Sequence, residues 1–151
     1  MHRLPVSEIM RTTVVTIGPD ELVADAAQLM EEFDIRRLPV VDEDDCLIGI
    51  VTDTDVLEAE TAGSVLSSYE PSVENEWLAV SDIMTPDVIS IPPDATVGTL
   101  ATILMEHKIG GVPVVDAASA PTKCKRLIGI VTEMDIFRLI ADAWKKETEG
   151  I

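Results

Sequence analysis

The residues best suited to chemistry stand in one short motif that the chain contains twice. Residues 49–55 read GIVTDTD and residues 129–135 read GIVTEMD. In the first copy Thr52 and Asp55 have the spacing of a capping box, which predicts a strand that ends where a helix begins. A helix N-terminus offers backbone N–H groups and the positive end of the helix dipole to an anion. The motif therefore has two interpretations, a purely structural cap and a site for a phosphorylated ligand.

In the second interpretation, the side chains of the motif have separate tasks. The threonine hydroxyl donates to a phosphate, and the aspartate carboxylate accepts hydrogen bonds from two ribose hydroxyls, as an acidic residue does in dinucleotide sites. Thr132 and Asp135 repeat this pair in the second copy.

A pair of arginines distinguishes the two copies. Arg36 and Arg37 precede the segment LPVVD, whereas Gly110 and Gly111 precede the matching VPVVD. Guanidinium groups fit phosphate oxygens, so the first copy should bind phosphate better than the second. The glycines, which lack Cβ, would instead admit a ligand's base close to the backbone. The alternative for the arginines is a solvated strand edge, paired with carboxylates such as those of residues 42–45.

The whole chain is a tandem duplication. Residues 6–42 align with residues 80–116 at an offset of 74, with 16 identities in 37 positions. Residues 47–55 align with residues 127–135 at an offset of 80, with seven identities in nine positions. This repetition predicts two copies of one folding unit.

Each copy should contain a helical stub, a strand, a helix, two strands and a second helix. The stubs, 6–10 and 80–84, should be capped by Ser7 and Ser81. β-branched runs at 14–17 and 88–91 predict first strands, and Pro-Asp pairs at 19–20 and 93–94 predict the stop and the helix cap that follow. The predicted boundaries are repeat 1 at 1–59, a linker at 60–79, repeat 2 at 80–146 and a tail at 147–151.

Composition excludes several classes of protein. The chain of 151 residues has a net charge of −17, which repels phosphate backbones and argues against nucleic-acid binding. We expect no signal peptide and no membrane span, since the apolar runs are short, and we expect a cytoplasmic protein. Two cysteines in a chain of this size fit a reducing compartment, so we expect no disulfide.

The doubled order of elements, with PVVD and GIVTxxD in each copy, resembles a pair of cystathionine-β-synthase (CBS) domains, also called a Bateman module. The resemblance covers nearly the whole chain. It implies an α+β fold of two β-α-β-β-α units packed sheet to sheet about a pseudo-twofold axis. It also implies two clefts that bind adenine nucleotides, dimerisation, and regulation of another protein.

The resemblance further implies which residues face the ligand. Thr52, Asp55, Thr132 and Asp135 would contact ribose and phosphate, and Arg36 and Arg37 would neutralise phosphate. One copy would supply the base contacts while the other supplies ribose and phosphate contacts. The implied base-binding residues are Thr13, Val14, Ile35, Asp87, Val88, Ile109, Gly110 and Gly111. For each aliphatic residue among them, core packing is the alternative.

We therefore predict a stand-alone regulatory module that senses AMP, ADP or ATP and has no obligatory cofactor. The alternative is a structural dimerisation module whose clefts are empty or bind another adenosyl ligand such as S-adenosylmethionine. We expect no enzyme, because no catalytic motif occurs, and no metal site, because His2 and His107 lack partners at metal-ligand spacing. The regulated partner would be a separate, unidentified chain.

We also expect a homodimer. The predicted second helices carry more apolar surface than one chain of this size can cover, and such surface marks interfaces. Its residues are Val56, Leu57, Ile136, Phe137, Leu139, Ile140 and Trp144.

Overall fold

The structure is a computed structural model that describes residues 1–67, 78–116 and 124–149. It divides the chain into two compact units. We call residues Val15–Val88 the central unit, and Met1–Val14 together with Ile89–Ile151 the terminal unit. Each unit combines helices with a small sheet, so the predicted α+β class is confirmed.

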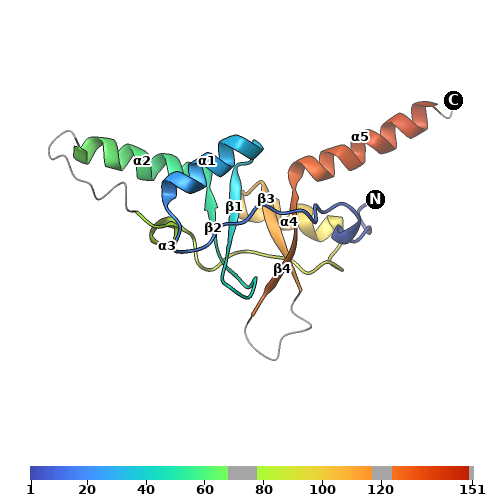
Figure 1. Cartoon of the computed structure of the whole chain (residues 1–151). Coiled ribbons are helices and arrows are strands. Elements are labelled where there is room, and N and C mark those ends of the chain that lie inside the picture. Colours follow the sequence, from blue (N-terminus) through green and yellow to red (C-terminus); the bar gives the residue numbers. More distant parts are fainter. Residues whose placement is uncertain (68–77, 117–123, 150–151) are drawn as a thin grey trace. The chain divides into compact units, whose positions relative to one another are not determined.

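The central unit is built on a two-stranded antiparallel sheet of β1 (Arg37–Val41) and β2 (Leu47–Thr52). Three helices accompany the sheet: α1 (Val23–Phe33), α2 (Asp53–Ser67) and the short α3 (Val80–Ile83) (Figure 1). The helix α2 follows β2 without any intervening residue, which places the predicted motif at the strand-to-helix junction.

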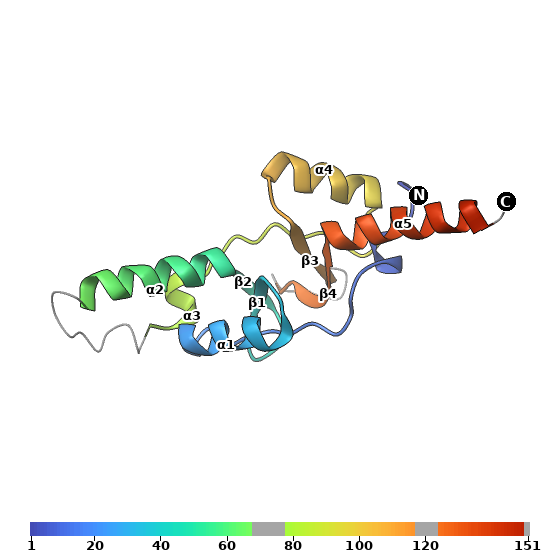
Figure 2. The ribbon, with the colours of Figure 1, turned by 90° about the horizontal axis from the view of Figure 1, so that it is seen from above.

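The terminal unit repeats this plan. Its sheet pairs β3 (Gly111–Asp116) with β4 (Arg126–Thr132), and its helices are α4 (Val97–His107), α5 (Glu133–Glu149) and the 3₁₀ helix η1 (Val6–Glu8). Both sheets shift register at the same point, between Val40 and Val41 and between Val114 and Val115. The helix α5 continues well beyond the sheet of its own unit (Figure 2).

Each unit takes its N-terminal stub from the other sequence repeat. The 3₁₀ helix η1, from repeat 1, lies in the terminal unit, where Val6 is fully buried beside Leu100 and Val112. The helix α3, from repeat 2, lies in the central unit, where Val80 is fully buried. The compact units therefore differ from the sequence repeats, and the repeat boundaries given above stay a prediction.

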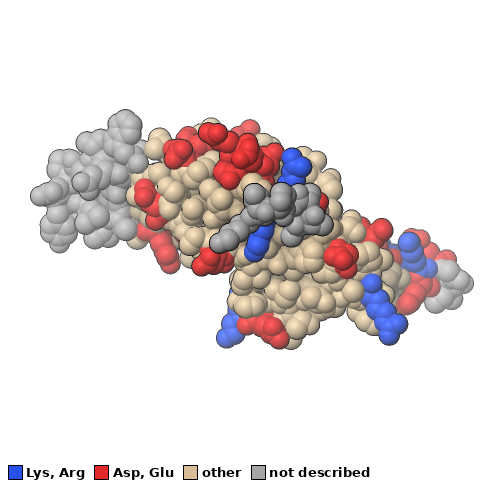
Figure 3. Space-filling view, turned by 90° about the horizontal axis from the view of Figure 1, so that it is seen from below, with Lys and Arg blue, Asp and Glu red and all other residues tan. Residues whose placement is uncertain are grey.

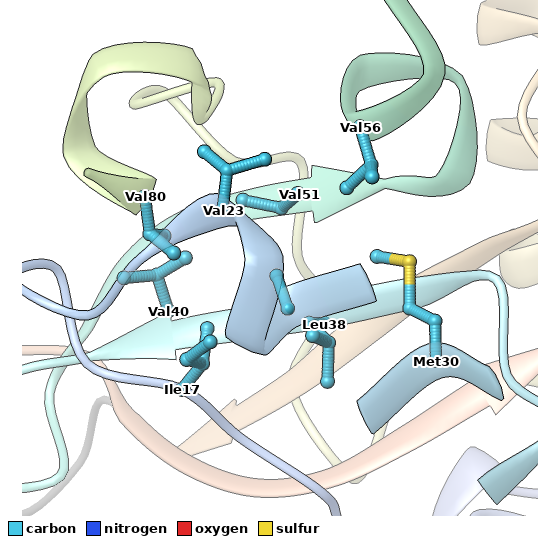
Figure 4. Close-up of a cluster of buried hydrophobic side chains, with 9 residues drawn as sticks. Ile17, Val23, Met30, Leu38, Val40, Val51, Val56 and Val80 are labelled. Carbon is cyan, nitrogen blue, oxygen red and sulfur yellow. The ribbon is translucent and has the colours of Figure 1, made fainter. Parts of the chain in front are cut away.

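The two cores are aliphatic, as expected for a chain in which only 3% of the residues are Phe, Trp or Tyr. Figure 4 shows the central core, in which side chains from both strands and all three helices point toward one another. Its members are Ile17, Val23, Ala26, Met30, Leu38, Val40, Val51, Val56 and Val80. Because Val80 belongs to this cluster, the exchanged stub is part of the core and is held by apolar burial.

The predicted first strands are shorter than expected. In place of strands at 14–17 and 88–91, the structure has single parallel bridges, Ile17 with Val40 and Ile91 with Val114. Gly18-Pro19 and Pro92-Pro93 follow these bridges directly. Proline has no N–H to donate, so the pairing stops there.

The predicted helix caps at Ser7, Ser81, Asp20 and Asp94 are wrong. The N-cap residues are Pro5 and Ala79 for the stubs, and Leu22 and Thr96 for the helices. The physical reason lies in the exchanged segments: Leu78 O accepts from Val23 N at 2.9 Å, and Leu4 O accepts from Val97 N at 2.8 Å. These backbone carbonyls bind the N–H groups of the first residues of α1 and α4, so both helices begin after the predicted caps.

The expectation of reduced cysteines is also wrong for this structure, because Cys46 and Cys124 are both disulfide-bonded.

None of the helices in the described ranges combines the length and the apolar composition that a membrane span requires.

Candidate functional site

The central-unit motif is a closed capping box. Thr52 N donates to Asp55 Oδ2 at 2.9 Å, and Asp55 N donates to Thr52 Oγ1 at 3.2 Å. Asp53 N donates to Arg36 O at 2.8 Å, and Thr54 N donates to Asp53 Oδ1 at 2.9 Å. The first backbone donors of α2 are therefore already bonded, so a phosphate here would rely on side-chain donors. The expectation of free backbone N–H groups at this helix start is therefore wrong for residues 52–55.

The Asp55 side chain nevertheless keeps capacity for a ligand. Asp55 is half-buried, and the bond from Thr52 N engages its Oδ2 atom. Among the described residues, no hydrogen bond or ion pair reaches its Oδ1 atom. A half-buried carboxylate oxygen of this kind is suited to accept from hydroxyl groups.

Arg36 and Arg37 lie beside this motif. Arg37 stands directly opposite Thr52 in the β1–β2 register, where Cβ atoms of paired residues are about 5 Å apart. Arg36 is exposed and Arg37 is half-buried. Within the part of the chain that the structure describes, both ion pairs belong to Asp135, so neither arginine is paired with a carboxylate.

The alternative partner for these arginines is the acidic turn at 42–45, in which Asp42 binds backbone N–H groups of the turn itself. Asp42 Oδ1 accepts from Asp44 N at 2.9 Å and from Cys46 N at 3.0 Å. The turn also follows the far end of β1, and a strand rises about 3.3 Å per residue. The arginines and the acidic turn therefore lie at opposite ends of the strand.

The terminal-unit motif has the same backbone and a different electrostatic setting. Thr132 N and Thr132 Oγ1 donate to Asp135 Oδ2 at 2.8 and 3.3 Å. Arg138 Nη1 donates to Asp135 Oδ1 at 3.4 Å, and Arg11 Nε lies 3.9 Å from the same oxygen. Asp135 is only 3% exposed. Sequence reasoning missed Arg11 and Arg138, although the repeat offsets place Thr85 and Glu58 at their matching positions.

The remaining candidates divide between the units. Ile35, Asp87 and Val88 lie in the central unit with Thr52 and Asp55. The terminal unit contains Thr132 and Asp135 together with the candidates Thr13, Val14, Ile109, Gly110 and Gly111. Each unit thus joins the motif of one repeat to the segment that follows the stub of the other.

The aliphatic candidates also have packing roles, as their alternative interpretation requires. Ile35 packs against the central core and Ile109 against the terminal core. Thr13 and Asp87 are exposed, and Val14 and Val88 are half-buried.

The charged side chains of the chain are mainly acidic, with 28 Asp and Glu against 11 Lys and Arg. On the face drawn in Figure 3, Asp and Glu side chains cover more area than Lys and Arg. Within the described ranges, no group of three or more His, Cys, Asp or Glu side chains is arranged to hold a metal ion.

The duplicated α+β unit, with a threonine-aspartate pair hydrogen-bonded at each strand-to-helix junction, defines a two-repeat module. The chain belongs to the CBS domain family, whose model matches residues 6–62 and 80–142. The resemblance inferred from the motifs is therefore confirmed.

Curated relatives place the same module in longer chains. Protein MJ1404 of Methanocaldococcus jannaschii is 35% identical over 152 residues, which is 96% of this chain and 34% of that protein. Inosine-5'-monophosphate dehydrogenase of the same organism is 31% identical over 87% of this chain and 22% of the enzyme. This chain thus spans about a third or less of these relatives, and the catalytic names belong to the longer proteins.

Solved structures match the chain over most of its length. The AcuB protein of Vibrio cholerae, named for acetoin utilization, has a TM-score of 0.77 at 29% identity and covers 97% of this chain and 96% of its own. CBSX2 in complex with AMP has a TM-score of 0.75 at 28% identity, covering 93% and 98%. The CBS domain pair of protein MJ0100, in complex with 5'-methylthioadenosine and S-adenosyl-L-methionine, has a TM-score of 0.72 at 29% identity, covering 92% and 97%.

Proposed function

We propose that this chain is a regulatory module that binds an adenine nucleotide, AMP, ADP or ATP, through the central-unit motif. The observation that carries the proposal is the pairing of a half-buried Asp55 with two arginines. Among the described residues, one Asp55 carboxylate oxygen has no partner and neither arginine is paired with a carboxylate. The carboxylate is suited to ribose hydroxyls and the guanidinium groups to phosphate. Thr52 would add a hydroxyl donor to the phosphate.

The grouping of residues within the central unit supports this assignment. Asp87 and Val88 come from the second repeat, whereas Asp55 and Arg37 come from the first. A base contact from one repeat and ribose and phosphate contacts from the other would therefore arise within one compact unit. In the terminal unit, Thr13 and Val14 have the same relation to Thr132 and Asp135.

The solved neighbours support an adenosyl ligand, and the arginine pair favours a phosphorylated one. One neighbour is described in complex with AMP and another with 5'-methylthioadenosine and S-adenosyl-L-methionine. S-Adenosylmethionine carries a sulfonium cation in place of phosphates, so two adjacent arginines would disfavour it. It is the second candidate, because a neighbour at 29% identity is described with it.

We further propose that the module acts in the cytoplasm and regulates a separate protein, through a change in its shape or in its association. A net charge of −17 disfavours nucleic acid as that partner.

Isothermal titration calorimetry and thermal shift with AMP, ADP, ATP, adenosine and S-adenosylmethionine test the proposal. A ligand that binds the native state alone raises the midpoint of unfolding. We expect at least one phosphorylated adenine nucleotide to bind more tightly than adenosine. The proposal fails if none of these nucleotides at millimolar concentration gives heat or a shift. Preferential binding of S-adenosylmethionine would establish the second candidate.

A further inference from the structure

Asp55 and Asp135 hold the same position in the two motifs, but their carboxylate oxygens differ in the number of hydrogen bonds and ion pairs that the protein itself supplies. Asp135 is 3% exposed, and its Oδ2 atom accepts two hydrogen bonds from Thr132. Its Oδ1 atom faces two guanidinium groups, Arg138 at 3.4 Å and Arg11 at 3.9 Å. Both oxygens are therefore engaged by the protein itself. Asp55 is half-buried and receives one side-chain hydrogen bond among the described residues.

The difference arises from two positions in the repeat. Arg11 pairs through its backbone with Ile130, and Thr85 pairs in the same way with Ile50. Asp135 and Asp55 each stand five residues after those partners. The central unit thus has Thr85 where the terminal unit has Arg11, and Glu58 where the terminal unit has Arg138.

We propose that Arg11, with Arg138, occupies Asp135 and excludes ribose from the terminal-unit motif, so that each chain binds one adenine nucleotide, at the central-unit motif. This inference rests on the proposed function and assigns its ligand to one of two equivalent motifs. Arg11 and Arg138 are then the residues that determine the specificity of the terminal unit.

The physical reason is the cost of separating a buried charge from its partners. A ribose hydroxyl that replaced a guanidinium at Asp135 would exchange a charge-assisted contact for a neutral hydrogen bond, beside a buried carboxylate. At Asp55 the same hydroxyl approaches an oxygen that no described side chain holds, so nothing has to be displaced. For the ribose contact, ligand binding at the two motifs therefore differs by the cost of displacing Arg11 and Arg138.

The reciprocal exchange of residues tests the inference. Calorimetric titration of the full chain with AMP should give one site, whose affinity Asp55→Ala lowers and Asp135→Ala leaves unchanged. Thr85→Arg should place a guanidinium on Asp55, as Arg11 does on Asp135, and weaken AMP binding by about tenfold or more. Thr85→Met is the matched control, because methionine is similar in length to arginine but uncharged, and it should weaken AMP binding less than Thr85→Arg. Arg11→Thr with Arg138→Ala should raise the stoichiometry to two.

The outcomes separate this inference from the proposed function. Two sites in the unaltered chain, or loss of a site in Arg11→Thr, would overturn the inference and make Arg11 a ligand contact, while the proposed function stands. Tighter AMP binding by Thr85→Arg would overturn it as well, and this variant keeps the test decisive if the double arginine variant does not fold. Absence of binding by every adenine nucleotide would overturn both.

Discussion

At the scale of single residues, the Asp55 side chain caps a helix and is also proposed to bind the nucleotide. Asp55 accepts from Thr52 N with one oxygen, which stabilises the start of α2. Its other oxygen has no partner among the described residues. Because the two tasks use different oxygens, they can be separated by measuring stability and affinity on the same variant.

Replacing Asp55 by Ala should lower both quantities. Loss of the cap costs about 0.5–2 kcal/mol of unfolding free energy. Loss of the acceptor should weaken AMP binding by about 1.5–3 kcal/mol, the range for hydrogen bonds to charged groups. Urea unfolding and calorimetry measure the two effects.

Asp82→Ala is the matched control for this variant. Asp82 Oδ2 accepts from Ala79 N at 3.0 Å, so Asp82 caps a helix of the same unit outside the motif. This variant should lose stability and keep its affinity for AMP. If Asp55→Ala behaves in the same way, Asp55 is only a cap.

The arginine pair should discriminate between ligands by charge. Arg36→Gly with Arg37→Gly gives the first repeat the residues that the second has at Gly110 and Gly111. ATP affinity should fall more than adenosine affinity, since only ATP carries phosphate charge, and the loss should shrink at high salt. Calorimetry with both ligands at two salt concentrations measures this. Equal losses for ATP and adenosine would contradict a phosphate role.

At the scale of elements, the exchanged stubs bring two loops against the strands that end in the motifs. The backbones of Arg11 and Ile130 exchange two hydrogen bonds of 2.9 Å, and Thr85 and Ile50 exchange two of 2.9 and 3.0 Å. This contact is close because the preceding strand residue is glycine. A Cβ built on Gly129 would lie 2.7 Å from Met10 Sδ and 3.0 Å from Arg11 O.

Gly129→Ala should therefore destabilise the chain by about 1–3 kcal/mol, the usual cost of overpacking. The Met10 side chain can move aside. The Arg11 carbonyl is hydrogen-bonded in the bridge to Ile130, so relieving its contact with the new Cβ requires a shift of the backbone. Urea unfolding measures the loss.

The control for this variant is Gly18→Ala, whose new Cβ would meet only Glu21 Cγ at 4.0 Å. Alanine also reduces the freedom of the unfolded chain, so Gly18→Ala should leave stability unchanged or raise it slightly. Equal losses in the two variants would contradict the close approach at Gly129.

The sequence predicted those elements whose signal is local. The spacing of Thr52 and Asp55 predicts the junction of β2 and α2, and the structure has this junction with both reciprocal hydrogen bonds. The predicted caps at Ser7 and Asp20 are wrong because these helices start at other residues, where backbone groups from distant segments bind the first N–H groups, as Leu78 O does for Val23 N. Such tertiary contacts leave no local pattern.

The exchange of stubs and the occupation of Asp135 were likewise beyond sequence reasoning. The repeat aligns Val6 with Val80 and therefore shows that the two stubs are alike. It does not show which core each of them enters. Arg11 and Asp135 are far apart in sequence, so only the fold reveals their ion pair at 3.9 Å.

At the scale of the whole molecule, the acidic charge and the apolar face of α5 act in opposite directions on association. The chain carries a net charge of −17, which opposes the approach of a second copy. Met134, Phe137, Ile140 and Trp144 of α5 follow a helical spacing, and each is at least 50% exposed. Val56 and Ile136, by contrast, pack within their units.

We expect the apolar face to prevail and the chain to form a homodimer. Fully burying one large apolar side chain contributes about 1.5–3 kcal/mol, and α5 offers several such side chains. Like charges on two copies repel more weakly in salt, so the dimer should dissociate at lower salt and tighten as salt rises. Light scattering at micromolar concentration, at two salt concentrations, measures the mass. A monomer at both would contradict the prediction.

The variant Phe137→Glu should shift this equilibrium toward monomer. It removes an apolar side chain that is 55% exposed in the single chain, and it adds a negative charge where two copies would meet. The dimer dissociation constant should rise by at least about tenfold, since 1.4 kcal/mol already gives that factor. The control is Lys145→Ala, which replaces an exposed polar side chain of the same helix and should leave the mass measured by light scattering unchanged. If Phe137→Glu remains a dimer, α5 is not the interface, and the exposed Leu57 on α2 becomes the next surface to test.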